Sequence, residues 1–464
     1  MVFNSIFSYM SFAIYVVIFL LVYGYVKRII TYKGFNGLSM FILSFSMFYF
    51  VVPFIQTFFK LYRDDTSLFT RLLNQISDEE IFLNLFISSI CLLLIVFSYK
   101  LNFKSKGSEP IQDSINQNVV GKDVLYKKIN RITDMVFLVG LGSMIFLIAE
   151  VGSLKTYLSL GAMTRGLDKS PTDFIRSSYL QLVTLSVIIL VTPYLYLYLY
   201  RMKKSKFIII KFLVSFLFSV LFLFYNQGRA PLIIFFLPFL FTISKRSKKN
   251  FLGLVGMFVV GLFLLNYLDA IFQYFAYGNY LVEKNGNFIT GFLSEFSYPF
   301  TNFSLRNDLI DINGYRYMYD YLIWPLTMIP SSLLNIVGLS KESLISVSTL
   351  NTEAYGVLLG VTPTGGIPVD LLTYNYYQFG FVTLIPMCFV IGRILRKLDK
   401  IFVFFDNNFA IKIVLYRISF SLITFLNNAD ISAIVRNRLD VVLLALIIIY
   451  IYKKSLKVSL KQKL

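Results

Sequence analysis

Long apolar runs alternate with short clusters of lysine and arginine along most of this chain, and a stretch between Asp269 and Thr373 interrupts the pattern. The runs are about 20 residues long, which is the length that an α-helix needs to cross the hydrocarbon core of a bilayer. Irregular polar sequence survives in such a protein only outside the hydrocarbon or along a wet cavity. The sequence therefore predicts a chain threaded many times through a membrane, with one large segment outside it.

Composition supports a membrane protein over a soluble one. Of the 464 residues, 57% are hydrophobic and 15% are charged, whereas a soluble protein carries roughly 25% charged residues. The net charge of +19 comes from residues that flank apolar runs, a placement that membrane topology explains better than nucleic-acid binding does. Cys91 and Cys388 lie inside apolar runs, so a disulfide framework is not indicated. The first run lacks a cleavage site and is expected to be retained as a span.

The predicted fold is an all-α polytopic membrane protein with about eleven transmembrane helices, within a range of ten to twelve. Three segments follow: a bundle of eight spans over 1–270, a large periplasmic loop with interfacial or re-entrant parts over 271–373, and three spans with a cytoplasmic tail over 374–464. Most lysines and arginines fall on one side when the amino terminus is outside and the carboxy terminus is cytoplasmic. The predicted spans are 8–26, 37–59, 81–99, 135–152, 177–200, 207–225, 230–244, 251–270, 374–392, 409–426 and 440–452.

The chain contains no histidine, which excludes histidine-ligated zinc and Ser-His-Asp chemistry. It also lacks a Walker A or dinucleotide-binding fingerprint. A reaction outside the cytoplasm would therefore use a pre-activated donor, carboxylates as bases and arginines as anion ligands, and no cofactor is expected. The adjacent acids Asp64 and Asp65 can be interpreted as metal ligands, but neighbouring acids are common and no metal site is predicted.

Several arginines lie on the predicted outer side. Arg229 occupies a tight turn between two spans, and Arg165 and Arg176 lie in an outer loop. Arg436 precedes the last span on the outer side, against the positive-inside pattern. A guanidinium meets phosphate oxygens with two parallel hydrogen bonds, so these residues are candidates for binding a lipid-linked pyrophosphate. The alternative is that each is a snorkelling or solvated surface charge.

Carboxylates and tyrosines of the outer segment complete the candidate site. Glu353, Asp370 and Glu295 are the candidate general bases, with Glu353 first because it lies in a threonine-rich stretch next to Tyr355. Glu353 can equally be a solvated loop acid, and Asp370 can equally cap the ninth span. Tyr355 and two further tyrosines are candidate glycan ligands, with an interfacial aromatic belt as the alternative for the tyrosine-rich segment. These two further residues are Tyr298 and Tyr374.

The order of short motifs resembles the Wzy-type O-antigen (oligosaccharide repeat-unit) polymerases. It comprises a Gly-Arg turn within 226–231, Ile329-Pro330, a threonine-rich stretch, Thr-Pro-Thr-Gly-Gly at 362–366 and a Tyr-x-x-Phe-Gly sequence ending at Gly380. The resemblance covers most of the chain in topology and residues 226–231 and 329–395 in motifs. It implies a GT-C-like multispan fold in the bacterial inner membrane. It also implies transfer of a growing glycan from undecaprenyl pyrophosphate to a new lipid-linked repeat unit.

By the same resemblance, Arg229, Arg165 and Arg436 would lie around the diphosphate, and a chain-length regulator would be a partner. An O-antigen ligase shares the topology and the donor, and it remains an alternative. A polysaccharide flippase or other transporter is the alternative from a different class. A transporter would show two similar halves and charged residues within its spans, whereas the charges of this chain are expected to cluster outside the spans.

Overall fold

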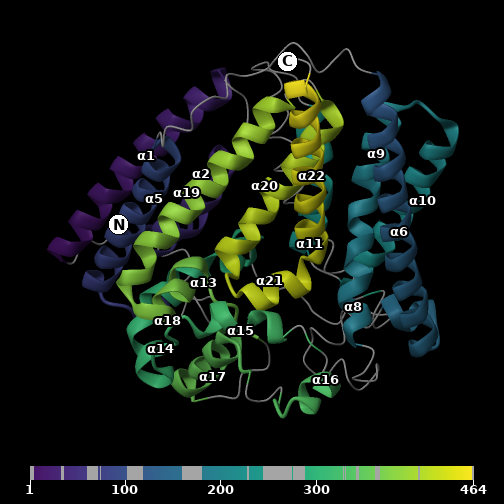
Figure 1. Cartoon of the computed structure of the whole chain (residues 1–464). Coiled ribbons are helices and arrows are strands. Elements are labelled where there is room, and N and C mark those ends of the chain that lie inside the picture. The colour runs from purple at the N-terminus through teal and green to yellow at the C-terminus, as the bar shows by residue number, and fades with distance from the viewer. Residues whose placement is uncertain are drawn as a thin grey trace. The chain divides into compact units, whose positions relative to one another are not determined.

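The structure is a computed structural model of the whole chain (Figure 1), and its secondary structure is described for most residues. In the described part all regular secondary structure is helical, which confirms the all-α prediction. Within these described residues, seven helical stretches are long and apolar enough to cross a membrane, as expected of a multi-pass membrane protein. The described residues are 5–32, 36–59, 72–73, 75–101, 119–158, 180–226, 229–243, 274, 288–327, 329, 331–340, 344–360, 366–405 and 408–461.

The seven stretches coincide with seven of the predicted spans. They are Ile6–Tyr25, Gly37–Thr57, Asp78–Lys100, Asp123–Val151, Gln181–Met202, Lys206–Tyr225 and Phe409–Asn427. Predicted span 230–244 corresponds to α11 (Arg229–Ile243), which has only 15 residues. Predicted span 251–270 lies outside the described residues. Predicted span 440–452 falls within the longer helix α22 (Leu439–Lys461).

The predicted span 374–392 is wrong as a single helix, because the chain breaks at Gly380 into α18 (Leu371–Phe379) and α19 (Phe381–Phe404). Gly380 has φ +61° and ψ −139°, a conformation that is accessible almost only to glycine. The Thr383 hydroxyl donates to the Gly380 carbonyl oxygen over 3.0 Å and stabilises the break. Hydropathy does not reveal the break, because apolar residues continue on both sides of it.

The chain forms two compact units, each assembled from three stretches of sequence. The first unit comprises Met1–Phe103, Lys284–Asp399 and Leu422–Ile434. The second unit comprises Lys104–Glu283, Lys400–Ser421 and Val435–Leu464. The first unit therefore draws on all three of the segments predicted from the sequence.

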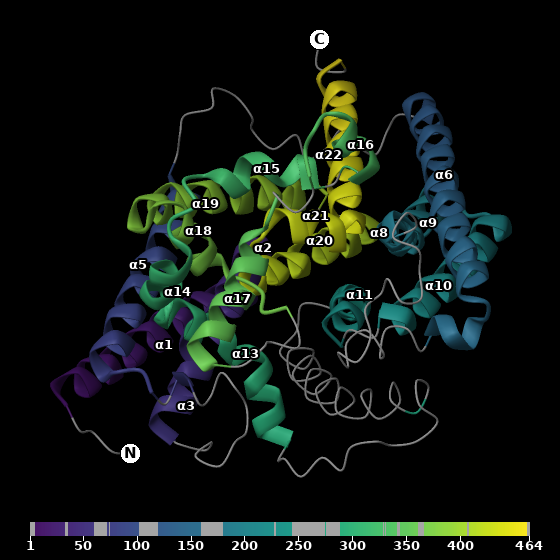
Figure 2. The ribbon, with the colours of Figure 1, turned by 90° about the horizontal axis from the view of Figure 1, so that it is seen from below.

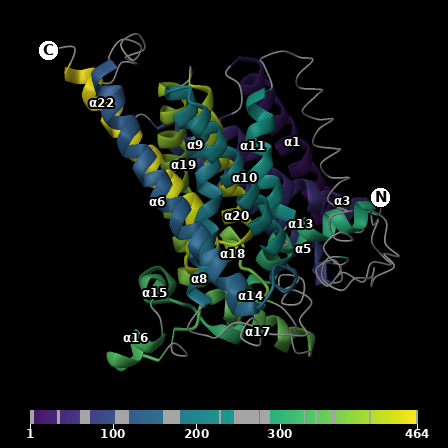
Figure 3. The ribbon, with the colours of Figure 1, turned by 90° about the vertical axis from the view of Figure 1, so that its right-hand side faces the viewer.

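In the first unit, short helices gather at one end of the long ones (Figures 1 and 3). Figure 2, seen from below, looks onto these short helices. The described part of the predicted large loop is thus mainly helical. The long or membrane-length elements are α1 (Ile6–Tyr32), α2 (Gly37–Ser46) continued by the π-helix η1 (Met47–Val51) and α3 (Val52–Phe59), α5 (Asp78–Lys100) and α19. The others are α13 (Phe288–Ser304), α14 (Arg306–Asn313), α15 (Tyr319–Thr327), α16 (Ser331–Ile336), α17 (Val347–Leu359) and α18.

A glycine allows α5 and α19 to approach closely. A Cβ atom added at Gly392 would lie 2.6 Å from the Ile95 carbonyl oxygen and 2.7 Å from the Ser98 Cβ. At the same contact the Ser98 hydroxyl donates to the Phe389 carbonyl oxygen over 2.8 Å. Small residues permit such backbone contacts between membrane helices, where packing replaces the hydrophobic effect as the source of association.

Gly392→Leu is expected to separate α5 from α19 and to lower the free energy of unfolding by about 3 kcal/mol, the upper end of the usual range for overpacking. The melting temperature of the purified protein in one detergent measures the effect. Gly24→Leu is the matched control, because a Cβ at Gly24 of α1 meets nothing within 4 Å. Equal melting temperatures for the two variants would contradict this account of the contact.

The second unit contains α6 (Val119–Val151), α8 (Leu180–Ser186), α9 (Thr192–Met202) and α10 (Lys206–Asn226), several of which run lengthwise in Figure 3. A 3-10 turn, η4 (Val187–Val191), joins α8 to α9. The unit also contains α11, α22 and the first part of α20 (Phe409–Asn427). The short helix α21 (Ile431–Asn437) leads into α22.

Charged side chains are paired inside the second unit. Arg417, near the middle of α20, donates from Nη2 to Asp440 Oδ2 of α22 over 2.6 Å, and the two side chains are 1% and 2% exposed. Lys211 of α10 pairs with Asp134 of α6 at 2.7 Å. The expectation that charges cluster outside the spans is therefore wrong for Arg417, which lies within Phe409–Asn427, and for Lys211, which lies within Lys206–Tyr225. Counting charges along the sequence could not show that a mid-helix arginine has a buried partner.

Candidate functional site

The segment 366–370 belongs to the first unit and forms no helix. Three neighbours bond its backbone: Asn302 Nδ2 donates to the Pro368 oxygen over 2.9 Å, the Ile367 amide donates to Thr352 Oγ1 over 2.8 Å, and the Ala429 amide donates to the Val369 oxygen over 2.8 Å. A Gly/Pro-rich segment cannot pair its backbone internally, so these external partners satisfy it. The result is a rigid approach to Asp370, which begins α18.

Asp370 is fully buried and caps the N-terminus of α18. Its Oδ1 accepts hydrogen bonds from the amides of Leu372 and Thr373, at 3.0 and 3.2 Å, and from the Tyr49 hydroxyl at 2.6 Å. Among the described residues, its Oδ2 has no hydrogen-bond partner. One carboxylate oxygen therefore stabilises the helix, and the other is a buried acceptor that a substrate cannot reach in this conformation.

Burial raises the pKa of Asp370 to about 6, although hydrogen bonds from Thr373 and Tyr49 act in the opposite direction. Desolvation disfavours the charged form of a carboxyl group, and donors to the carboxylate favour it. A carboxylate with a pKa near 6 stays ionised at neutral pH and binds a proton more readily than an ordinary aspartate. Asp370 thus has the properties of a general base.

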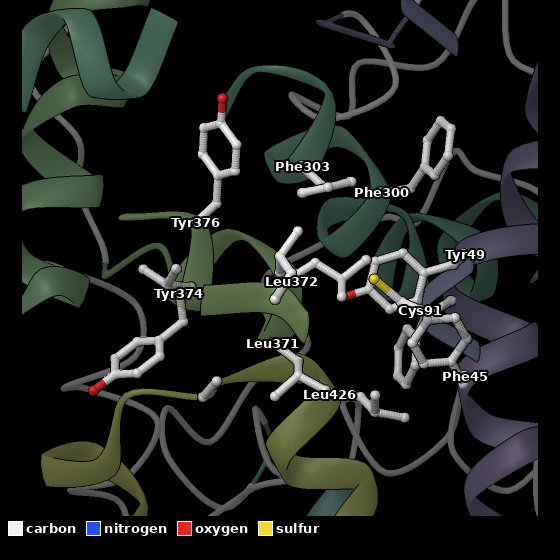
Figure 4. Packing of buried hydrophobic residues seen from close by; sticks show 14 of the residues in the cluster. Phe45, Tyr49, Cys91, Phe300, Phe303, Leu371, Leu372, Tyr374, Tyr376 and Leu426 are labelled. Carbon is white, nitrogen blue, oxygen red and sulfur yellow. The ribbon is translucent and has the colours of Figure 1, made fainter. Parts of the chain in front are cut away.

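Tyrosines surround this carboxylate. The Tyr355 hydroxyl donates to Asn302 Oδ1 over 2.5 Å, and the Tyr298 hydroxyl donates to the Asn427 carbonyl oxygen. Burial raises the pKa of both tyrosines, and the nearby Asp370 charge raises it further. Figure 4 shows Tyr49 beside Leu372, within the same apolar packing. We refer to Asp370, Tyr49, Tyr298, Tyr355 and Asn302 as the Asp370 cluster.

The predicted carboxylates fall in different environments. Asp370 lies at the centre of the Asp370 cluster, whereas Glu353 is exposed on α17. Glu295 belongs to α13, but its side chain lies outside the described part. Asp64 and Asp65 also lie outside the described residues.

The predicted glycan ligands Tyr298, Tyr355 and Tyr374 are all buried, at 9%, 0% and 1% exposure. A ring without an exposed face cannot stack on a sugar in this conformation. Tyr374 leaves α18 in a different direction from Tyr376 (Figure 4) and packs against Tyr321, with ring centroids 5.4 Å apart. Tyr298 and Tyr355 instead help to enclose Asp370.

The predicted phosphate ligands all belong to the second unit. Arg436 ends α21 with an exposed side chain. Arg229 begins α11, but its side chain lies outside the described part. Arg165 and Arg176 lie outside the described residues.

Arg306 of α14 is a buried arginine that sequence reasoning missed. It is 2% exposed, and its Nη1 donates to the Asn84 side-chain oxygen and, over 2.9 Å, to the Phe303 oxygen. Its guanidinium lies 5.0 Å from the ring centre of Phe303 and 5.6 Å from that of Tyr376. Its Nε has no partner among the described residues. Burial lowers the pKa of Arg306, as expected for a desolvated cation.

The arrangement holds a buried carboxylate of raised pKa beside phenol hydroxyls, and it can accept a proton from a substrate hydroxyl only if the Asp370 cluster opens. Among the described residues, no three acidic or cysteine side chains are grouped in a way that could hold a metal ion. The described cysteines, Cys91 and Cys388, are both buried and free. Comparison with known protein families, with curated proteins and with solved structures finds no match to this chain.

Proposed function

We propose that this protein is a glycosyltransferase that polymerises lipid-linked oligosaccharide repeat units on the outer face of a bacterial inner membrane. The multi-pass helical architecture supports a lipid-linked substrate, and the motif order resembles that of the O-antigen polymerases. The observation that carries the proposal is the buried carboxylate of Asp370, with its raised pKa and its surrounding tyrosines. In this proposal the amino terminus is periplasmic, the carboxy terminus is cytoplasmic, and a chain-length regulator is a partner.

The proposed step is a single group transfer. A hydroxyl on the nonreducing-end sugar of a new repeat unit attacks the anomeric carbon of the growing glycan. The bond from that carbon to the pyrophosphate oxygen breaks, and undecaprenyl pyrophosphate leaves with the electron pair. Asp370 takes the hydroxyl proton once the side chains that bury its carboxylate move aside, because none of it is exposed in this conformation. Positioned cations would stabilise the charge that grows on the leaving group.

Among the candidate bases, Asp370 is preferred over Glu353. Burial moves the pKa of a carboxylate toward the working pH, which makes it a better base there than a solvated carboxylate. The glycine- and proline-rich segment before Asp370 is held by hydrogen bonds from outside it, which fixes the position of the carboxylate. Glu353 serves as a comparison in the mutational test below.

The first test is the pattern of surface lipopolysaccharide on a gel from a strain in which the gene is deleted. Lipid A core carrying a single repeat unit is the expected result, because ligation continues without polymerisation. Long polymer that remains on the carrier lipid, with none on the core, would instead identify a ligase. Normal long chains would contradict the proposal.

A transporter is the second candidate, and the buried pair of Arg417 and Asp440 favours it. Ionisable residues inside membrane helices frequently line substrate or ion pathways. In that case repeat units would accumulate on the cytoplasmic face of the membrane in the deletion strain. Accessibility of the lipid-linked repeat units to an added, membrane-impermeant glycosidase distinguishes the two candidates.

A further inference from the structure

A connected group of aromatic rings lies where α18 meets α19. Ring centroids are 6.2 Å apart for Tyr315 and Tyr317, 5.3 Å for Tyr317 and Phe379, and 5.0 Å for Tyr376 and Phe381. Tyr315 also lies 6.4 Å from Tyr376, which joins the two halves. We call these five residues the aromatic platform. Four of them are exposed, with Tyr317 at 66% and Phe381 at 47%.

The backbone that presents Tyr317 is strained. Tyr317 and Met318 have φ of +50° and +64°, and they are the non-glycine residues with positive φ in the described part of the chain. Such a conformation costs about 1 kcal/mol or more for each residue. It is held by the Arg316 amide, which donates to the Tyr377 oxygen over 2.7 Å, and by the Tyr317 amide, which donates to the Gln378 oxygen over 3.0 Å.

A partly buried ion pair fixes the same turn. The Arg316 guanidinium donates to both carboxylate oxygens of Asp320, at 3.0 and 3.1 Å. Asp320 also accepts from Gln378 Nε2 over 3.0 Å and from the Val347 amide over 3.2 Å. Tyr317 is therefore a surface ring on a fixed turn, and little backbone freedom remains to be lost on binding.

Polar groups border the aromatic platform. The Tyr376 hydroxyl donates to Asn307 Oδ1 over 3.0 Å. Asp311 is exposed one helical turn beyond Asn307, on the same face of α14, and Asp308 is exposed next to Asn307. The Arg306 guanidinium lies 5.8 Å from the Phe381 ring centre. Flat rings beside hydroxyl, amide and carboxylate groups match the apolar faces and the hydroxyls of a sugar.

The charges argue against a membrane surface as the occupant. Asp308 and Asp311 are exposed on α14, the helix of Asn307, and carboxylates are repelled by anionic lipid headgroups. A neutral, hydroxyl-rich ligand is not repelled in this way.

We propose that the aromatic platform is a carbohydrate-binding subsite, in which a pyranose ring stacks on Tyr317 and meets Phe379 at its side, because the two rings are 70° apart. The identity of the carbohydrate as the growing polysaccharide rests on the proposed function. The nine residues of α18 separate the platform from Asp370 by about 13 Å along the helix axis. The subsite would therefore hold sugars some units away from the reacting bond, so that the polymer stays bound between transfers.

A tryptophan reporter tests the subsite directly. The chain has one tryptophan, Trp324, so Trp324→Phe provides a silent background and Tyr317→Trp adds a reporter. The full-length protein is placed in lipid nanodiscs, and polysaccharide released by mild acid from the strain's own surface is titrated in. A saturable change of tryptophan fluorescence, with no quenching by brominated lipids, is expected.

Tyr23→Trp in the same background is the control. Tyr23 is 64% exposed within the candidate span Ile6–Tyr25, so brominated lipid should quench this reporter and polysaccharide should not affect it. Quenching of Trp at position 317 by brominated lipid, without a response to polysaccharide, would overturn the proposal and assign the platform to the membrane interface.

A second measurement separates this proposal from the proposed function. In cells, Tyr317→Ala is expected to shorten the polymer while still extending the first repeat unit, and Tyr317→Phe should restore long chains because it keeps the ring. Full-length chains from Tyr317→Ala would contradict the subsite. If the deletion strain makes normal polymer but the reporter still binds polysaccharide, the proposed function fails and the subsite stands.

Discussion

Asp370→Asn is expected to reduce polymer formation about 100-fold or more, which is the lower end of the usual contribution of a general base. Asparagine can still accept hydrogen bonds from the Leu372 and Thr373 amides, so the N-cap of α18 is retained. The protein should therefore remain folded while the proton acceptor is lost. Polymer yield per mole of membrane protein, from lipid-linked repeat units supplied to purified enzyme, measures the effect.

Glu353→Gln is the matched control, since it removes the exposed candidate carboxylate and leaves the Asp370 cluster intact. Near-normal polymer is expected from this variant. If Glu353→Gln abolishes polymerisation and Asp370→Asn does not, the assignment of the base to Asp370 is wrong and Glu353 takes its place.

The pH dependence gives an independent signature of Asp370. Activity should fall as pH decreases through about 6, because the carboxyl group then carries a proton. Tyr49→Phe removes a donor that lowers this pKa, so the acid limb of the profile should move to higher pH. A purely structural role for Tyr49 would lower activity without moving the limb.

Stability should respond to pH in the opposite sense. The folded-state pKa of Asp370 is above its ordinary value of 3.8, so between these values the native state binds more protons than the unfolded state. The contribution of Asp370 to the free energy of unfolding therefore decreases as pH rises from about 3.8 to about 6, and is constant above that. Asp370→Asn should lack this slope in melting temperature and be no less stable at pH 7.

Arg417→Leu is expected to lower the free energy of unfolding by about 3–5 kcal/mol, because it leaves the Asp440 carboxylate buried without its partner. Both side chains are almost fully buried, and the Arg417 guanidinium also lies 5.9 Å from the Phe235 ring centre. The yield of monodisperse protein and its melting temperature in detergent measure the loss.

The double variant Arg417→Met with Asp440→Leu is the matched comparison. Removal of both charges avoids an unpaired one, so most of the stability should return. A double variant that is as unstable as Arg417→Leu would contradict this explanation. A stable double variant that makes no polymer would show that the pair serves activity. Accessibility of its lipid-linked repeat units to the membrane-impermeant glycosidase would then decide whether that activity is transport.

The architecture was largely predictable from the sequence, because crossing a bilayer imposes a local requirement. Length and apolar composition can be measured in a window of about 20 residues, and seven predicted spans coincide with helices of the required kind. The break at Gly380 escaped this reasoning, since a single backbone conformation and not the hydropathy ends α18 there.

The candidate site was predictable only in part. Asp370 and Tyr355 were recognisable as polar residues near a predicted membrane entrance, but their partners were not. Tyr49 lies 321 positions away from Asp370 in an otherwise apolar run, and no local pattern marks it as the donor to that carboxylate. The local sequence likewise does not reveal that Arg306 is buried or that Tyr317 is exposed.

Hydropathy and the distribution of charge were thus sufficient for the class of protein and for most of its helices, because the bilayer acts on each segment separately. Tertiary packing decided which carboxylate is desolvated, which arginine is paired and which rings remain exposed. Those properties depend on neighbours that are distant in sequence, and it is these neighbours that set the proton affinity of Asp370 and the accessibility of the aromatic platform.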